Sequence, residues 1–187
     1  MDKKELRKLI REKKKAMTPE AMAQESHMVF DTIEALQAFK NAQNILLYYS
    51  LPDELPTHEV VERWSHMKNV YLPRVNGEEL DILKYDANSL KESDDYKIEE
   101  PEGAELIDPT TIDLVIVPAV GLDKHCHRMG RGKGFYDRLL PKCKNAYLIG
   151  VALNCQLLDE IPVEEFDINM CGVVTASHIS FSKAYKK

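Results

Sequence analysis

Five strongly apolar runs, in a chain that also contains segments with helical periodicity, are the feature that most limits how this chain can fold. The runs are NILLYYS at 44–50, NVYLP at 69–73, TIDLVIVPAVGL at 111–122, AYLIGVAL at 146–153 and CGVVTA at 171–176. Runs that are apolar throughout, rather than alternating with polar residues, are typical of parallel strands covered on both faces. Because helical segments alternate with them, we predict an α/β fold: a doubly wound, mostly parallel sheet with helices on both faces.

The spacing of apolar residues outside these runs predicts amphipathic helices. The predicted helices cover 3–15, 18–39, 57–67 and 134–140. Thr18 stands where an N-cap is expected, and Pro19 suits the first position of the helix that follows. Thr57 is the predicted N-cap of the third helix, and Pro141 is expected to end the fourth.

The remaining segments predict exposed structure around a single core. Residues 78–85 are expected to form a shorter, more exposed strand, and the polar, acidic residues 87–106 a surface loop. No internal repeat, low-complexity tract or linker interrupts the chain. Since 187 residues also suit one domain of ordinary size, we expect residues 1–187 to form a single domain.

The composition excludes several classes of protein. Hydrophobic residues make up 44% of the chain and charged residues 30%, which argues against disorder. No apolar run approaches the length of a membrane span, and the basic N-terminal segment lacks the apolar core of a signal peptide. The four cysteines are widely spaced without a Cys-x-x-Cys pair, which favours reduced thiols. We therefore expect a cytoplasmic protein with no membrane partner.

The net charge of −6 conceals two basic segments on an otherwise acidic chain. Residues 1–15 contain eight Lys or Arg against three acids, and residues 124–144 contain seven against one. Such short basic segments suit a compact polyanion better than a nucleic-acid backbone, which usually meets a broad basic surface. For residues 1–15, an ordinary solvated helix face is an equally good interpretation.

The second basic segment contains the stretch HRMGRGKGFYDR at 127–138. Glycines at alternate positions let the backbone approach a ligand closely, and the interleaved cations with a following helix start would hold an anion such as phosphate. The glycines are Gly130, Gly132 and Gly134, and the cations are Arg128, Arg131 and Lys133. The spacing fits neither the P-loop nor the dinucleotide-binding pattern, and a flexible hairpin remains the alternative.

Asp137 is the only acid in this basic segment. It could form a salt bridge to Arg131 or Lys133, or it could hold a magnesium ion beside bound phosphates. The neighbouring HCHR stretch at 125–128 makes a poor zinc site, because no matching second pair of ligands occurs.

The order VPAVGLD…RMGRGKGFYDRLL resembles the signature of the 5-formyltetrahydrofolate cyclo-ligase family. Met129 replaces the usual leucine of that signature, Phe135 replaces a tyrosine, and Cys126 stands where a glycine is common. Weaker similarity continues through KKELR at 3–7, YYSLPDELPT at 48–57 and FDI at 166–168, so the resemblance covers most of the chain.

This resemblance implies an enzyme of one-carbon metabolism, with ATP as co-substrate and Mg²⁺ as cofactor. Its reaction would close 5-formyltetrahydrofolate to 5,10-methenyltetrahydrofolate and release ADP and phosphate. The formamide oxygen is a poor leaving group, so transfer of the γ-phosphate onto it would activate the carbon for attack by N10. The protein would mainly position two anionic substrates and stabilise developing charge.

The resemblance also implies roles for particular residues. The residues implied in ATP binding are Lys3, Lys4, Arg7, Arg128, Gly130, Arg131, Gly132, Lys133, Gly134, Phe135 and Tyr136. Those implied in substrate binding are Tyr49, Glu54, Arg131, Gly132, Lys133, Gly134, Phe135 and Tyr136. Lys133 and Arg131 would be catalytic, and Asp137 with Asp167 would hold magnesium.

Several of these residues also have plainer interpretations. Tyr49 lies in an apolar strand and could simply pack in the core, and Tyr136 could merely anchor its helix. Asp167 could be an ordinary loop acid, since EEFD is acidic throughout.

Two other functions are compatible with the sequence. One is a sugar-phosphate isomerase or CoA-transferase-like enzyme that binds a substrate phosphate without hydrolysing ATP. The other is a non-catalytic nucleotide- or RNA-binding module. The acidic remainder of the chain argues against nucleic acid, and we expect a monomer that binds small molecules.

Overall fold

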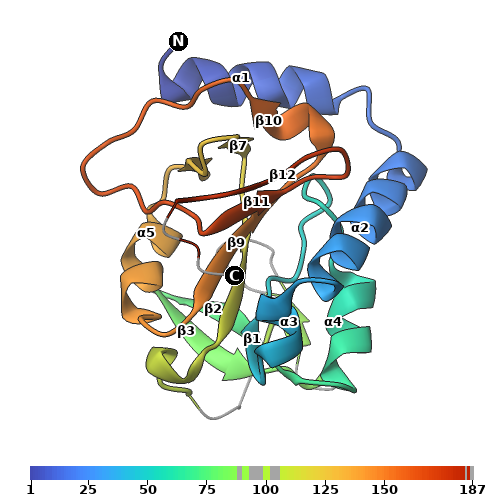
Figure 1. The fold of residues 1–187 in the computed structure, drawn as a ribbon, viewed down its shortest axis with the longest axis vertical. Helices are drawn as coiled ribbons and strands as arrows, with labels where there is room; N and C mark the ends of the chain where they lie inside the picture. The colour runs from blue at the N-terminus through green and yellow to red at the C-terminus, as the bar shows by residue number, and fades with distance from the viewer. Residues whose placement is uncertain (88–89, 93–98, 102–105, 184, 186–187) are drawn as a thin grey trace.

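The computed structural model describes residues 1–87, 90–92, 99–101, 106–183 and 185. Its main sheet has seven strands in the order β12-β11-β9-β6-β1-β2-β3 (Figure 1). Their bounds are β1 Asn44–Leu46, β2 Asn69–Asn76, β3 Glu79–Lys84, β6 Leu114–Pro118, β9 Tyr147–Val151, β11 Gly172–Val174 and β12 Ile179–Phe181. The five central strands run parallel, while β3 and β12 pair antiparallel at the two edges.

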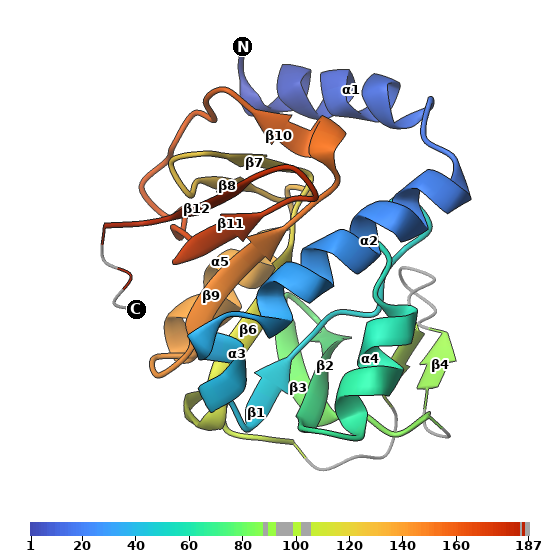
Figure 2. The ribbon, with the colours of Figure 1, turned by 45° about the vertical axis from the view of Figure 1, so that its right-hand side comes forward.

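Helices cover both faces of this sheet, as predicted. Helices α2 (Pro19–Glu34), α3 (Gln37–Asn41) and α4 (His58–Ser65) lie on one face, and α5 (Phe135–Leu139) lies on the other (Figure 2). The central strand β6 shows why its sequence is apolar throughout. Leu114 and Ile116 pack in the core cluster that includes α2, α3 and α4, whereas Val115 and Val117 pack in the cluster on the α5 side.

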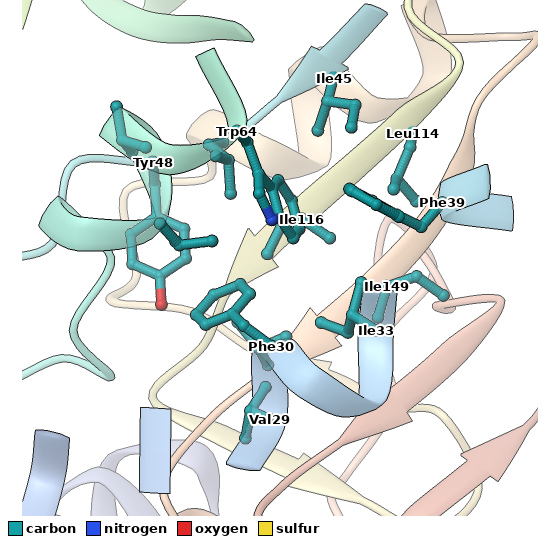
Figure 3. Packing of buried hydrophobic residues seen from close by; sticks show 14 of the residues in the cluster. Val29, Phe30, Ile33, Phe39, Ile45, Tyr48, Trp64, Leu114, Ile116 and Ile149 are labelled. Atoms are coloured by element: carbon teal, nitrogen blue, oxygen red, sulfur yellow. The ribbon is translucent and has the colours of Figure 1, made fainter. Parts of the chain in front are cut away.

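The larger core cluster is centred on Trp64, which is fully buried (Figure 3). The ring of Phe30 meets the indole edge-on at 5.5 Å, and the ring of Phe39 lies 4.6 Å away. The indole Nε1 donates a 2.7 Å hydrogen bond to Glu34, so its one polar group is satisfied. This cluster fixes α2, α3 and α4 on the sheet.

A second sheet, of three short strands, lies beyond the carboxyl end of β6. It consists of β7 (Gly121–Asp123), β8 (Arg128–Met129) and β10 (Leu157–Leu158). Helix α1 (Lys3–Lys14) lies next to this sheet at the top of Figure 1. Its buried residues Leu6 and Ile10 pack against Met129 of β8.

The predicted strand at 111–122 is therefore wrong in its length, because the chain leaves the main sheet after Pro118. Proline lacks the N–H that would continue the ladder. The side chain of Gln156 donates to the carbonyls of Ala119 and Val120, at 3.0 and 3.1 Å, and so satisfies backbone groups where the chain changes sheets.

Several other boundaries also differ from the prediction. The helix expected at 18–39 is two helices, α2 and α3, and the strand expected at 44–50 ends at Leu46. Thr57 occupies the N-cap position of α4, but its side chain makes no capping hydrogen bond.

The loop expected at 87–106 contains strands β4 (Leu90–Glu92) and β5 (Glu99–Pro101), which pair antiparallel. The rest of that prediction, at 88–89, 93–98 and 102–105, lies outside the described residues. Within the described residues, short 3₁₀ turns lie at Pro109–Thr111, Leu140–Lys142 and Asn154–Gln156. Among the helices of the described residues, none combines the length and apolar character needed to cross a membrane.

Candidate functional site

A cavity of about 530 Å³ opens at the carboxyl end of the parallel strands, between the two sheets. Its walls come from α1, the segment after β1, the β2–β3 hairpin, the glycine segment 128–137 and residues 164–167. Ligands of open α/β sheets bind at this edge. Every site residue predicted from the sequence lines the cavity except Lys4, which is exposed one position away from Lys3 on α1.

The three glycines of the segment are needed for different reasons. Gly132 and Gly134 have φ values of 100° and 71°, in the region that other residues rarely adopt. Gly130 has an ordinary φ, but a Cβ there would lie 3.0 Å from the guanidinium of Arg128. Gly132 and Gly134 therefore shape the backbone, and Gly130 leaves space for the Arg128 side chain.

Arg128 is a partly buried charge of the cavity wall. Its Nε donates to the carbonyl of Pro118 at 2.7 Å, and its guanidinium lies over the Tyr136 ring at 5.0 Å. Within the part of the chain that the structure describes, no carboxylate forms an ion pair with it. Burial lowers the pKa of Arg128, yet an arginine stays charged at neutral pH. A positive charge withdrawn from water in this way favours an anionic ligand.

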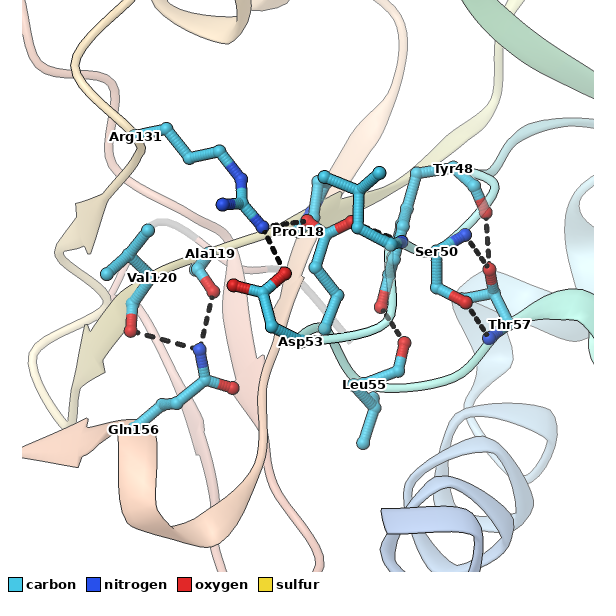
Figure 4. A network of polar contacts seen from close by, with 12 residues as sticks. Tyr48, Ser50, Asp53, Leu55, Thr57, Pro118, Ala119, Val120, Arg131 and Gln156 are labelled. Carbon is cyan, nitrogen blue, oxygen red and sulfur yellow. Dashed lines mark hydrogen bonds and ion pairs between the residues drawn. The ribbon is translucent and has the colours of Figure 1, made fainter. Parts of the chain in front are cut away.

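Arg131 is bound to the segment that follows β1 (Figure 4). It forms an ion pair with Asp53 at 2.7 Å and lies 3.7 Å from Glu54. Lys14, from the end of α1, reaches the other carboxylate oxygen of Asp53 at 3.0 Å. Asp53 was not among the residues predicted from the sequence, where the only signal for it was its position next to Glu54 in LPDEL.

The two neighbouring acids differ in their ionisation. Burial alone would raise the pKa of Asp53, but hydrogen bonds from Arg131 and Lys14 outweigh it and lower that pKa. Burial raises the pKa of Glu54, and this effect exceeds the opposing influence of its 2.8 Å bond from the Leu51 amide. Glu54 therefore lies in the cavity as a carboxyl group that gives up its proton less readily.

Helix α1 contacts both the glycine segment and residues 164–167. Lys3 bonds to Asp167 at 2.5 Å and lies 3.4 Å from Glu164, and Arg7 donates to the carbonyl of Gly130 at 2.8 Å. The structure thus brings the first basic segment into contact with the second. Glu164 is a further cavity residue that the sequence analysis missed.

Asp137 and Asp167 line the same cavity as the cations. The Asp137 carboxylate makes no hydrogen bond or ion pair with the described residues. Asp167 accepts from Lys3 and from the Glu164 amide through Oδ2 alone, which leaves Oδ1 available. No cluster of three or more metal-binding side chains occurs among the described residues. Carboxylates in the lining of a cavity rich in cations fit Mg²⁺, which commonly takes its other ligands from phosphates and water.

The aromatic residues predicted for the site form part of its walls. Tyr49 stacks on His58 with ring centroids 3.8 Å apart, and His58 Nε2 lies 2.8 Å from the carbonyl of Ser50. Phe135 lies under the Arg138 guanidinium at 5.6 Å. Burial raises the pKa of Tyr136, which keeps its phenol protonated. Tyr49 is thus both a core contact and a cavity residue.

Comparison with known proteins agrees with this fold and with the family resemblance. The model of the 5-formyltetrahydrofolate cyclo-ligase family matches residues 1–176. The 5-formyltetrahydrofolate cyclo-ligase of Escherichia coli K12 is 31% identical over 179 residues, covering 91% of this chain and 98% of that protein. The mouse protein of the same name is 26% identical over 184 residues, covering 90% and 91%.

The solution structure of Aquifex aeolicus 5,10-methenyltetrahydrofolate synthetase has the same fold. It superposes with a TM-score of 0.88 at 28% identity, covering 100% of this chain and 96% of that one. The predicted α/β class and the family resemblance are both confirmed. A family match over nearly the whole chain, together with this shared fold, shows that the chain is an enzyme of the 5-formyltetrahydrofolate cyclo-ligase family.

Proposed function

We propose that this enzyme uses Mg-ATP to convert 5-formyltetrahydrofolate into 5,10-methenyltetrahydrofolate, with release of ADP and inorganic phosphate. The observation that carries the proposal is one cavity with two chemically different sides. The glycine segment supplies cations and a closely approachable backbone, while Tyr49 and Glu54 supply an aromatic ring and a carboxyl group. A polyphosphate suits the first side, and a pterin ring with its N–H donors suits the second.

In the proposed reaction, the formyl oxygen attacks the γ-phosphorus of ATP and the bond to ADP breaks. The formyl carbon is then attacked by N10, whose proton passes to water. The bond from that carbon to the phosphorylated oxygen breaks, and inorganic phosphate leaves. No protein nucleophile is required, so the chain's task is to hold the two substrates in line and to neutralise charge.

The cationic residues of the cavity fit that task. Lys133 and Arg131 would neutralise the transferred phosphoryl group, and Arg128 would bind an anionic oxygen from within the cavity. Lys3 and Arg7 would bind from α1, the latter already being attached to Gly130. Bound Mg²⁺ would supply further charge neutralisation, and Asp137 and Asp167 are the residues that would hold it.

On the other side of the cavity, Glu54 would accept hydrogen bonds from the pterin. The Leu51 amide already donates to Oε1, so Oε2, which lies 3.7 Å from Arg131, would be the acceptor for the ligand. Tyr49 would form the adjoining wall, with His58 stacked behind it.

The test is the appearance of methenyltetrahydrofolate absorbance when purified enzyme meets 5-formyltetrahydrofolate and Mg-ATP. Lys133→Ala is expected to lower kcat by about a hundredfold, because one charge on the transferring group is lost. Lys124→Ala is the matched control, since Lys124 is an exposed cation of the same basic segment outside the cavity. Turnover without ATP, or a Lys133→Ala enzyme as active as the control, would refute the proposal.

A further inference from the structure

Asp123, at the end of β7, is fully buried and does not line the cavity. Its Oδ1 accepts hydrogen bonds from the backbone amides of His125 and His127, at 2.9 and 3.0 Å. Its Oδ2 accepts from His127 Nδ1 and from the backbone amide of Ile161, both at 2.9 Å. Four donors therefore converge on one carboxylate, which is the number its two oxygens can accept.

These bonds connect two segments that form the anion side of the cavity. The turn 123–127 leads directly into Arg128 and the glycine segment. Ile161 begins the segment that carries Glu164 and Asp167. The far end of that segment is attached to the same turn, because the Met170 amide donates to the carbonyl of Cys126 at 2.9 Å.

From this geometry we propose that Asp123 is a positioning residue, which holds Arg128 and Asp167 in the arrangement that binds Mg-ATP. The inference rests on the proposed function, since it assigns Mg-ATP to this side of the cavity. Asp123 touches no ligand itself. It acts through the turn 123–127 on one wall and through Ile161 on the other.

A carboxylate is required at this position for a simple reason. Asparagine would replace one acceptor oxygen by an NH₂ group, which would face two of the four converging N–H donors. Buried donors without an acceptor are costly, so the contact to residue 161 or to the turn would open. The loop carrying Asp167 would then lose its near attachment while the glycines and cations remained chemically intact.

The chain provides a matched control at the opposite edge of the sheet. The Oδ2 atom of Asp113 accepts from the backbone amides of Gln43 and Asn44, at 2.9 and 2.8 Å, before β1 and β6 begin. Asp113→Asn likewise turns a carboxylate that caps backbone amides into an amide. It should lower stability without touching the cavity.

The experiment compares Asp123→Asn and Asp113→Asn below their thermal midpoints. Calorimetry measures the Kd of Mg-ATP without folate, amide hydrogen exchange measures the protection of residues 159–170, and kinetics give both KM values. We expect Asp123→Asn to raise the Kd of Mg-ATP about tenfold and to expose 159–170 to exchange. The KM for 5-formyltetrahydrofolate should stay close to wild type, and Asp113→Asn should match wild type in all three.

An Asp123→Asn enzyme with the Mg-ATP affinity of the Asp113→Asn control would overturn the proposal. If Asp123→Asn does not fold, His127→Phe decides, because it removes one of the four hydrogen bonds and keeps a ring. A smaller weakening of Mg-ATP binding is expected there, and an unchanged Kd would count against us. Wild-type enzyme that bound no Mg-ATP would instead defeat the proposed function, while the exchange data would still report whether Asp123 anchors the loop.

Discussion

At the scale of single residues, the site places two adjacent carboxyl groups in opposite electrostatic conditions. Asp53 is exposed and held by Arg131 and Lys14, so its ionised form is favoured. The side chain of Glu54 is only 14% exposed, and desolvation disfavours its ionised form. A partly desolvated carboxyl group is a cost to the fold, and it is the kind of cost that binding sites carry.

The difference in stability between Glu54→Gln and wild type should therefore depend on pH. The pKa of Glu54 in the folded protein is raised above its ordinary 4.5, so the folded state holds this proton more tightly than the unfolded chain. Wild-type stability then falls as pH rises from about 4.5 through the raised folded pKa. Glutamine does not ionise and should escape this loss, while the folate KM rises about tenfold because a charge-assisted bond is lost.

Thermal midpoints of both proteins between pH 4 and 8 check this prediction. The difference in favour of Glu54→Gln should widen with rising pH and then level off. A difference that narrowed with rising pH would mean that the folded pKa is lowered instead.

Gly130 offers a second prediction at this scale. A Cβ at this position would meet the Arg128 guanidinium at 3.0 Å and displace it, although the backbone itself would accept alanine. Gly130→Ala should thus lower kcat/KM about tenfold with little loss of stability, since misplacing a binding group impairs catalysis.

Gly77→Ala is the control, because its expected effects on stability and activity are the opposite. Gly77 has a φ of 62° in the turn between β2 and β3, with open space around its Cβ position. Alanine there should cost about 1 kcal/mol of stability through backbone strain and leave kcat/KM unchanged. Chemical denaturation and steady-state kinetics on the two variants separate the effects, and equal activities would contradict this account of Gly130.

At the scale of elements, the segment from Tyr48 to Thr57 shows how contacts within a loop can prevent a predicted N-cap from forming. The hydroxyl of Thr57 donates to the carbonyl of Tyr48 at 2.6 Å and accepts from the Ser50 amide at 2.9 Å (Figure 4). The Ser50 hydroxyl in turn accepts from the Thr57 amide at 2.9 Å, and Tyr48 donates to the carbonyl of Leu55 at 2.8 Å. The side chain expected to cap α4 instead closes the loop that presents Tyr49 and Glu54.

Thr57→Val should therefore cost more than the loss of an ordinary N-cap. Valine cannot bond to the Ser50 amide or the Tyr48 carbonyl, which are largely buried. The free energy of unfolding should therefore fall by about 2 kcal/mol. Thr18 is an N-cap whose hydroxyl accepts a hydrogen bond from the Ala21 amide. Thr18→Ala should therefore lower the free energy of unfolding by about 1 kcal/mol.

Urea unfolding measures both losses, and kinetics distinguish them further. Only Thr57→Val should also raise the KM for 5-formyltetrahydrofolate, because its loop presents Tyr49 and Glu54. If both variants lost equal stability and kept the same KM, the loop would not depend on Thr57.

Periodicity in the sequence predicted the central strands and the longer helices, because their burial is regular. It did not predict β8, β10 and β12, which have two or three residues each and are specified by pairing partners rather than by pattern. For the same reason the end of β6 was not predicted. The carbonyls of Ala119 and Val120 there accept hydrogen bonds from Gln156, which is distant in the sequence.

At the scale of the whole molecule, the cavity combines segments from residue 3 to residue 167. The glycine segment was predictable because its glycines and cations are adjacent in sequence. Asp53 and Asp123 were not predicted as site residues, because each matters only through partners that folding brings close, such as Arg131 and Ile161. What a residue contacts, rather than its type, decides its role in these cases.

A cavity assembled in this way predicts that ligand binding stabilises the entire fold. Since unfolding separates the walls, Mg-ATP at a hundred times its Kd should add about 2.7 kcal/mol to the free energy of unfolding. For a chain of this length, that gain corresponds to a rise in thermal midpoint of about 5–10 °C.

At the same ATP concentration, Lys133→Ala should show a clearly smaller rise in thermal midpoint, because loss of this charge should raise its Kd for Mg-ATP. Lys124→Ala, outside the cavity, should keep the full rise. Scanning fluorimetry of the three proteins with and without Mg-ATP makes the comparison without any turnover. If Lys133→Ala rose as much as wild type, the nucleotide would bind without Lys133, and the anion side of the cavity would have to be reassigned.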